Sequence, residues 1–171
     1  DECLNAAKKQ IFRLVDNFLI DDFGIPLEDM QIYFSGHRGY HIHVKTESIR
    51  SIDQEARREI ADYVGGQGFS FNALNFHKVQ QTMHGFHMDQ LGWPGKIAKE
   101  FYRVMLLEES DIQDIFSPYI NSNYIKVLIQ NKPFLLQILK NRNQIWQVKG
   151  IGEQVWYQIF DTMKDRIRAD I

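Results

Sequence analysis

The chain has 171 residues, of which 44% are hydrophobic and 13% aromatic. This apolar content is enough for the core of one domain, or of one domain with an appended lobe, and too high for a disordered chain. Lys and Arg number 20 against 22 Asp and Glu, and the resulting net charge of -2 argues against a protein that binds nucleic acid with its whole surface.

The amino terminus does not read as a signal peptide, because no basic stretch precedes an apolar one. No apolar run approaches the roughly 20 residues of a membrane span. The single cysteine, Cys3, excludes an internal disulfide and fits a reducing compartment. We therefore expect an intracellular protein with no membrane partner. The chain opens on Asp1 instead of Met, so we expect it to be part of a longer protein.

The first element predicted is an amphipathic helix over residues 4–22. Gly24 stands where a helix C-terminal cap would lie, and Pro26 prevents continuation. The apolar stripe of this helix consists of Ile11, Leu14, Val15, Phe18 and Leu19.

Two strands are predicted next, over residues 30–34 and 40–44, with a polar turn between them. Ser51, with Gln54 three residues later, resembles a capping box and predicts a helix that ends at about Val64.

The remainder of the chain is predicted to be irregular over residues 69–94 and helical afterwards, with Pro133 in the first turn of one helix. We predict an α+β fold with a mixed region at 1–68, an irregular connection at 69–95 and a helical lobe at 96–171. The helical stripes are Ile97, Phe101, Val104 and Met105, and then Val155, Ile159, Met163 and Ile167.

The turn between the two strands combines glycines with a cation, because Gly36 and Gly39 flank Arg38. Glycine permits a positive φ and lets an anion approach the backbone N–H groups. Arg38 offers a planar fork suited to phosphate oxygens, and Ser35 offers a hydroxyl donor.

Strand alternation places His41 and His43 on the face opposite Tyr40, Ile42 and Val44. The turn could therefore bring a serine, an arginine and a histidine onto one oxyanion, such as a triphosphate. Two alternatives remain open. The segment could be an ordinary hairpin with a solvated arginine, or the two histidines could be a metal pair, although no third ligand is visible nearby.

The pattern Ser-Gly-x-Arg-Gly-x-His, following a helix that ends in Asp22-Phe23-Gly24, resembles the second conserved motif of archaeal and eukaryotic DNA primase small subunits. The similarity covers about residues 1–66 and preserves the order and spacing of the elements. It implies part of the primase catalytic-domain β-sheet with flanking helices over 1–66, followed by a mainly helical lobe. The wording around Tyr40 is closer to archaeal members of the family.

The resemblance also implies roles for individual residues. Ser35, Arg38 and His41 would contact the phosphates of the incoming nucleotide, Gly36 and Gly39 would shape the loop, and His37 stands at a variable, often basic position. Cys3 would be the last ligand of a structural zinc site whose other ligands precede it. The candidate nucleotide-binding set is Ser35, Gly36, His37, Arg38, Gly39 and His41.

Members of this family synthesise short RNA primers on a DNA template by nucleotidyl transfer with Mg²⁺ or Mn²⁺ held by aspartates. We expect those catalytic aspartates to lie outside residues 1–171, so that this piece is inactive alone and holds neither those ions nor zinc. The implied partners are a primase large subunit, single-stranded DNA template and nucleoside triphosphates. The implied compartment is the cytoplasm in archaea, or the nucleus in a eukaryote.

Acidic and histidine residues elsewhere are weaker candidates for metal ligands. Asp21 and Asp22 are adjacent, so their side chains point apart. Three further aspartates are predicted to form a solvated helix face, and three histidines match no standard metal spacing, which favours a structural or surface role. These residues are Asp161, Asp165 and Asp170, and His77, His84 and His87.

The segment Val148 to Gly152 resembles the turn of helix-hairpin-helix DNA binders, in which backbone N–H groups meet a phosphate. An ordinary junction between helices has the same composition. The rival hypothesis is therefore a non-catalytic nucleic-acid-binding module built around residues 149–152. Four aromatics could stack bases but are more typical of a core: Trp93, Trp146, Trp156 and Tyr157.

Overall fold

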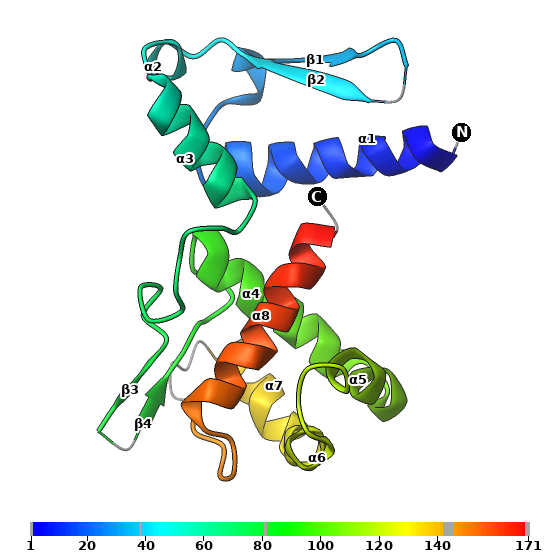
Figure 1. The fold of residues 1–171 in the computed structure, drawn as a ribbon, viewed down its shortest axis with the longest axis vertical. Coiled ribbons are helices and arrows are strands. Elements are labelled where there is room, and N and C mark those ends of the chain that lie inside the picture. Colours follow the sequence, from blue (N-terminus) through cyan, green and yellow to red (C-terminus); the bar gives the residue numbers. More distant parts are fainter. Residues whose placement is uncertain (1, 38, 81, 142–145, 170–171) are drawn as a thin grey trace. The chain divides into compact units, whose positions relative to one another are not determined.

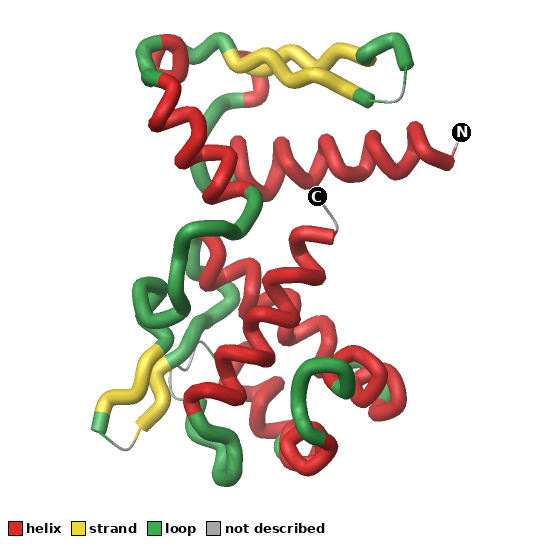
Figure 2. Tube along the Cα trace, viewed as in Figure 1, coloured by secondary structure: helices red, strands yellow, loops and turns green. Residues whose placement is uncertain are grey.

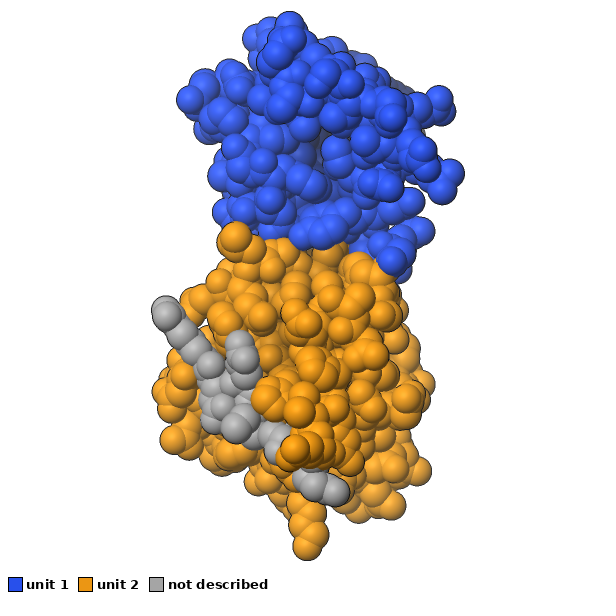
Figure 3. Space-filling model, turned by 90° about the vertical axis from the view of Figure 1, so that its left-hand side faces the viewer, with its two compact units in different colours: residues 1–68, 168–171 blue, residues 69–167 orange. Residues whose placement is uncertain are grey.

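The computed structural model describes residues 2–37, 39–80, 82–141 and 146–169. The chain divides into two compact units, one comprising Asp1–Gly68 with Arg168–Ile171, the other comprising Phe69–Ile167 (Figure 3). The α+β fold is confirmed, because the described part of the chain contains helices and two antiparallel sheets of two strands each (Figures 1 and 2). None of the described helices combines the length and apolar character that a bilayer crossing requires.

The first unit begins with α1 (Glu2–Leu14), which continues into a π-helical segment (Val15–Ile20). Gly24 ends this helix as predicted, with φ +63°. The Ile25 N–H donates to the Leu19 carbonyl at 2.8 Å and the Gly24 N–H donates to the Ile20 carbonyl at 3.0 Å, so two carbonyls at the end of the helix are satisfied. Strands β1 (Met30–Phe34) and β2 (Tyr40–Val44) follow, and β2 contacts α1 (Figure 1).

Two short elements complete the first unit, α2 (Glu47–Arg50) and α3 (Gln54–Val64). The predicted capping box at Ser51 is wrong. Asp53 is the N-cap of α3, and its carboxylate accepts from the Ala56 N–H at 2.9 Å. The Ser51 hydroxyl instead donates to the Ser48 carbonyl at the end of α2.

The core of the first unit is small and lies between the end of the first helix and the apolar face of the hairpin. Val15, Ile25 and Met30 are buried, and partly buried side chains from β2 and α2 pack against them. The Tyr63 hydroxyl donates to an Asp22 carboxylate oxygen at 3.0 Å, which ties α3 to the end of the first helix. The β1–β2 hairpin is thereby anchored at the end away from its turn.

The second unit is mostly helical, but it opens with a short hairpin of β3 (His77–Val79) and β4 (Thr82–His84). Residues 69–95, expected to be an irregular connection, therefore contain regular structure and lie within a compact unit. The helices are α4 (Gly92–Leu106), α5 (Glu109–Phe116), α6 (Ser122–Gln130), α7 (Lys132–Lys140) and α8 (Glu153–Ala169).

An aromatic cluster forms the core of the second unit. The rings of Phe76 and Phe160 meet edge to face with centroids 4.5 Å apart, a favourable aromatic geometry. The Trp146 indole N–H donates to the Phe86 carbonyl at 2.9 Å, so this buried polar group is satisfied. The predicted stripes are confirmed at Ile97, Phe101, Val104, Met105, Val155, Ile159 and Met163, all buried, while Ile167 is half-buried.

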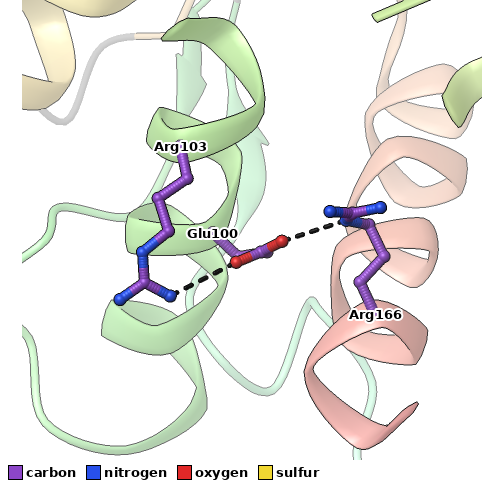
Figure 4. Close-up of polar contacts among 3 residues, drawn as sticks. All are labelled: Glu100, Arg103 and Arg166. Carbon is purple, nitrogen blue, oxygen red and sulfur yellow. Dashed lines mark hydrogen bonds and ion pairs between the residues drawn. The ribbon is translucent and has the colours of Figure 1, made fainter. Parts of the chain in front are cut away.

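Among the described residues of this unit, Glu100 is the charged residue that is buried. Glu100 on α4 is 8% exposed, and its two carboxylate oxygens accept from different arginines (Figure 4). Arg166 Nε on α8 lies 2.9 Å from Oε1, and Arg103 Nη1 lies 3.4 Å from Oε2. A carboxylate held in this way joins α4 to α8.

Candidate functional site

The candidate site lies at the turn of the β1–β2 hairpin, whose register fixes the faces of its side chains. Tyr33 pairs with His41 and Gln31 with His43, while Ile32 pairs with Ile42. Directly paired residues of an antiparallel sheet point to the same face. The predicted alternation is therefore confirmed, with both histidines on the face opposite the apolar set.

The histidine face of the hairpin is open to solvent. Tyr33, His41 and His43 are exposed. The rings of Tyr33 and His43 meet edge to face at 5.2 Å between centroids, and the Tyr33 hydroxyl donates to the side chain of Gln31. These contacts order the side chains around His41 and leave the His41 ring accessible to a ligand.

Ser35 organises the turn itself. Its backbone N–H donates to the Gly39 carbonyl at 2.9 Å, and its hydroxyl oxygen accepts from the Gly39 N–H at 3.1 Å. A longer contact of 3.5 Å brings the His37 N–H to the same oxygen. Gly36 has φ +84°, which favours glycine, and this part of the prediction is confirmed. The Ser35 O–H proton remains available for a bond to a ligand.

Of the described residues predicted to bind nucleotide, four lie in the turn, and His41 lies on β2 next to it. Ser35, Gly36 and His37 are exposed and Gly39 is half-buried. Arg38 lies outside the described residues, so its predicted convergence with Ser35 and His41 stays a prediction. Sequence reasoning missed one feature, which is that the serine hydroxyl shapes the loop as an acceptor as well as offering a donor. The spacing of four residues between Ser35 and Gly39 was the sequence signal that could have indicated this hydrogen bond.

No group of three or more histidine, cysteine or acidic side chains that could hold a metal ion occurs in the ranges that the structure describes. Cys3 is an exposed free thiol on α1. His41 and His43 point to one face, but they have no described third ligand, so the metal-pair alternative has no support. Two imidazoles or one thiol do not make a protein site for zinc, which needs three or four protein ligands.

The remaining histidines lie in the second unit. His77 pairs with His84 across the β3–β4 hairpin, and their rings stack at 6.1 Å between centroids. The His87 N–H donates to the Gln90 side chain at 2.8 Å, which helps form the turn before α4. These contacts fit the structural role that the sequence favoured.

The aspartates considered as metal ligands have other partners or lie in solvent. Asp22 accepts from Tyr63, and Asp161 pairs with Lys164 at 2.7 Å. Asp161 and Asp165 are exposed on α8, as predicted for a solvated face. Asp170 lies outside the described residues.

The turn at residues 149–152 joins the core to α8. Gly150 has φ +96°, and the Ile151 N–H donates to the Val148 carbonyl at 3.1 Å. The Val148 and Ile151 side chains are buried, while Lys149 is exposed. A hollow of about 460 Å³ beside the turn is lined by Lys149 and by Lys78 of β3.

The tryptophans considered as base-stacking residues belong to the core. Trp93, Trp146 and Trp156 are each 1% exposed or less, so none can meet a base. Tyr157 differs because it is half-buried, and its hydroxyl donates to Glu153 at 2.8 Å. Burial, and then the hydrogen bond and negative charge of Glu153, raise the pKa of Tyr157 to about 12.

Comparison with known proteins identifies the family. The family model for the DNA primase small subunit matches residues 1–135, which include the hairpin and most of the helices up to α7. The chain belongs to the DNA primase small subunit family. The resemblance inferred from the Ser35 to His41 motif is thus confirmed at the level of the family.

Archaeal primase small subunits are similar to this chain over different extents. The DNA primase small subunit PriS of Thermoplasma volcanium is 48% identical over 104 residues, 61% of this chain and 30% of that protein. The PriS of Methanothrix thermoacetophila is 32% identical over 90% of this chain and 34% of its own length. The PriS of Methanocaldococcus jannaschii is 30% identical over 98% of this chain and 39% of its own length.

The chain therefore spans about a third of the length of these primase relatives. The turn at 149–152 and α8 lie beyond the residues that the primase family model matches. The hairpin lies within them.

Proposed function

We propose that the hairpin turn, residues 35–41, binds the triphosphate of a nucleoside triphosphate in a protein that synthesises RNA primers on a DNA template. The observation that carries this proposal is the position of the turn. Ser35, Gly36, His37 and His41 are exposed, the Ser35 hydroxyl orders the turn, and the turn lies within the residues that match the DNA primase small subunit family. Exposed turns with unused donors are suited to anions.

Each residue of the turn would contribute differently. The Ser35 hydroxyl, already positioned by the Gly39 N–H, would donate its proton to a phosphate oxygen. His41 projects from the exposed face of β2 and would donate an imidazole N–H. Arg38, by the family resemblance, would supply a bidentate guanidinium contact and most of the charge.

The chemical step proposed for the whole protein is nucleotidyl transfer. The Mg²⁺ or Mn²⁺ ions that it needs would be held by aspartates outside residues 1–171. The role proposed for this chain is to bind and orient phosphate. Cys3 is proposed as one ligand of a structural zinc site completed by residues elsewhere.

The partners proposed for the whole protein are a primase large subunit, single-stranded DNA template and nucleoside triphosphates. The archaeal relatives favour a cytoplasmic setting. These assignments rest on membership of the family.

The rival function is nucleic-acid binding by the turn at 149–152. It is favoured by the positive φ of Gly150, three residues before α8, and by two lysines, Lys149 in the turn and Lys78 on the other side of the adjoining hollow. A Lys149→Ala variant distinguishes the two proposals. If the turn at 149–152 binds nucleic acid, this variant should bind duplex DNA more weakly, and its affinity should depend less steeply on salt concentration. If the hairpin binds phosphate, the variant should have an unchanged affinity for nucleotide.

Calorimetric titration of ATP into the chain tests the main proposal. Arg38→Ala is expected to weaken ATP binding about tenfold or more, because it removes a charge-assisted bidentate contact. Arg58→Ala is the matched control, since Arg58 is an exposed arginine on α3 whose side chain is 83% exposed. Equal ATP affinity in the two folded variants would contradict the proposal.

A further inference from the structure

An exposed tyrosine lies beside the proposed phosphate site. Tyr33 on β1 pairs directly with His41 on β2, so both side chains project from the same face of the hairpin. This face is turned away from the core of the first unit, and Tyr33 is 47% exposed. A large aromatic ring is thus open to solvent next to the residues proposed to bind phosphate.

The Tyr33 ring is held in place without being covered. His43 meets it edge to face, with centroids 5.2 Å apart and planes 73° apart. The Tyr33 hydroxyl donates to the side chain of Gln31, which pairs directly with His43 on the same face. A single neighbour in this geometry can cover only one of the two faces of a ring. Tyr33 therefore offers an oriented surface on which a planar group can stack.

The distance from the turn to this ring matches the dimensions of a nucleotide. Ser35 and His41, proposed to contact the triphosphate, lie at the end of the hairpin next to its turn. Residues two apart on a strand are separated by about 7 Å, so Tyr33 lies one such step from Ser35, towards the body of the hairpin. In a nucleotide one ribose separates the α-phosphate from the base, which is a comparable span. A triphosphate bound at the turn can therefore place its base over Tyr33.

A second pair of aromatic rings on the hairpin provides a comparison. Phe34 and Tyr40 also pair directly, and their rings meet edge to face with centroids 5.7 Å apart. Phe34 is 51% exposed, so exposure does not distinguish its ring from that of Tyr33. The difference is the face, because strand alternation turns Phe34 and Tyr40 away from the side that carries His41.

We propose that Tyr33 stacks on the base of the nucleoside triphosphate whose phosphates bind at residues 35–41, with Gln31 and His43 as positioning residues for its ring. The inference rests on the proposed function and deepens it, because it adds a contact to the base to a site defined so far by phosphate alone. Stacking on an aromatic ring accepts any base, since every base has a π-face. Tyr33 would therefore strengthen the binding of all four nucleotides and select none of them, as copying a template requires.

The test compares two ligands that differ only in whether a base is attached. ATP and ribose 5′-triphosphate carry the same triphosphate on the same sugar, and calorimetric titration measures the affinity of the chain for each. The unmodified chain is expected to bind ATP about fivefold or more tightly than ribose 5′-triphosphate. Tyr33→Leu is expected to abolish this preference by weakening ATP binding, and to leave the affinity for ribose 5′-triphosphate unchanged.

Two further variants control for a purely structural role of the ring. Tyr33→Phe keeps the ring and is expected to keep the preference for ATP. Phe34→Leu removes a similarly exposed ring from the other face of the same strand, and is also expected to keep the preference. A loss of preference in Phe34→Leu equal to that in Tyr33→Leu would contradict a specific role for Tyr33.

The outcomes separate this inference from the proposed function. Equal affinities of the unmodified chain for the two ligands would overturn the inference without recourse to any variant. An unchanged preference for ATP in folded Tyr33→Leu, or an equal loss of affinity for both ligands, would also overturn it. In each of these cases ribose 5′-triphosphate still binds to the unmodified chain, so phosphate binding at the hairpin stands. If neither ligand binds to the folded chain, the proposed function fails and this inference fails with it.

Discussion

Removing Arg166 should destabilise the second unit more than removing Arg103, although both arginines contact the same carboxylate (Figure 4). The Arg166 contact is the shorter, 2.9 Å against 3.4 Å, and its side chain is 41% exposed against 73% for Arg103. A hydrogen bond to a charged group contributes about 1.5–3 kcal/mol. Solvent screening at Arg166 reduces this, so Arg166→Ala should cost about 1–2 kcal/mol.

Arg103→Ala is the matched control for this prediction. Its contact is long and mostly exposed, and such pairs contribute about 0–1 kcal/mol. Urea denaturation followed by tryptophan fluorescence measures both variants, because all three tryptophans lie within the unit of residues 69–167. A cost for Arg103→Ala that equals or exceeds that for Arg166→Ala would refute the assignment of Arg166 as the main partner of Glu100.

Three further predictions test the local structure. Asp53→Ala should cost about 1 kcal/mol and speed amide hydrogen exchange in α3, while Ser51→Ala should not, because Asp53 is the N-cap. Gly95→Ala should lower the free energy of unfolding, measured by urea denaturation, by about 3 kcal/mol or more, because the new Cβ would lie 1.8 Å from a backbone carbonyl oxygen. Gly152→Ala should leave it nearly unchanged, because a Cβ at that position would have no atom within 4 Å. The raised pKa of Tyr157 favours its neutral form in the folded state, so its stabilising contribution is present below about pH 10 and is lost as the pH rises through about 12. Tyr157→Phe should remove the late step from the tyrosinate absorbance titration, and a late step that persists would contradict this reasoning.

The parts of the fold that local chemistry dictates were predictable from the sequence. Gly24 followed by Pro26 specified the end of the first helix, because only glycine takes a positive φ without strain there. The apolar spacing on α4 and α8 specified which faces are buried. Strand alternation likewise separated His41 from the apolar face of β2.

The features that depend on distant contacts were not predictable in this way. Ser51 and Asp53 are both suitable caps, and the choice between them depends on where α2 ends. Each strand of the β3–β4 hairpin has only three residues, which is too short for the alternation of apolar and polar residues to be recognised in the sequence. Its neighbour Phe76 is buried in the aromatic core, which is a tertiary constraint absent from the local pattern.

The sequence indicated which residues could form the candidate site but not their geometry. The motif points to Ser35 and His41 as nucleotide contacts, which stays a prediction, and both residues lie within the part of the chain that matches the family. The double use of the Ser35 hydroxyl depends on the path of the turn, which brings the Gly39 N–H back to within 3.1 Å. That path is set by the strand register, which the motif itself does not encode.

The most direct test of the central claim is an NMR titration of ATP into this chain, with and without Mg²⁺. The phosphate-binding hairpin predicts backbone shifts centred on residues 35–43 that are weak and largely independent of Mg²⁺. Ser35→Ala should reduce these shifts. It removes the hydroxyl that would donate a hydrogen bond to a phosphate oxygen and that accepts the Gly39 N–H, which orders the turn. A folded chain in which residues 35–43 do not shift at saturating ATP would contradict the claim.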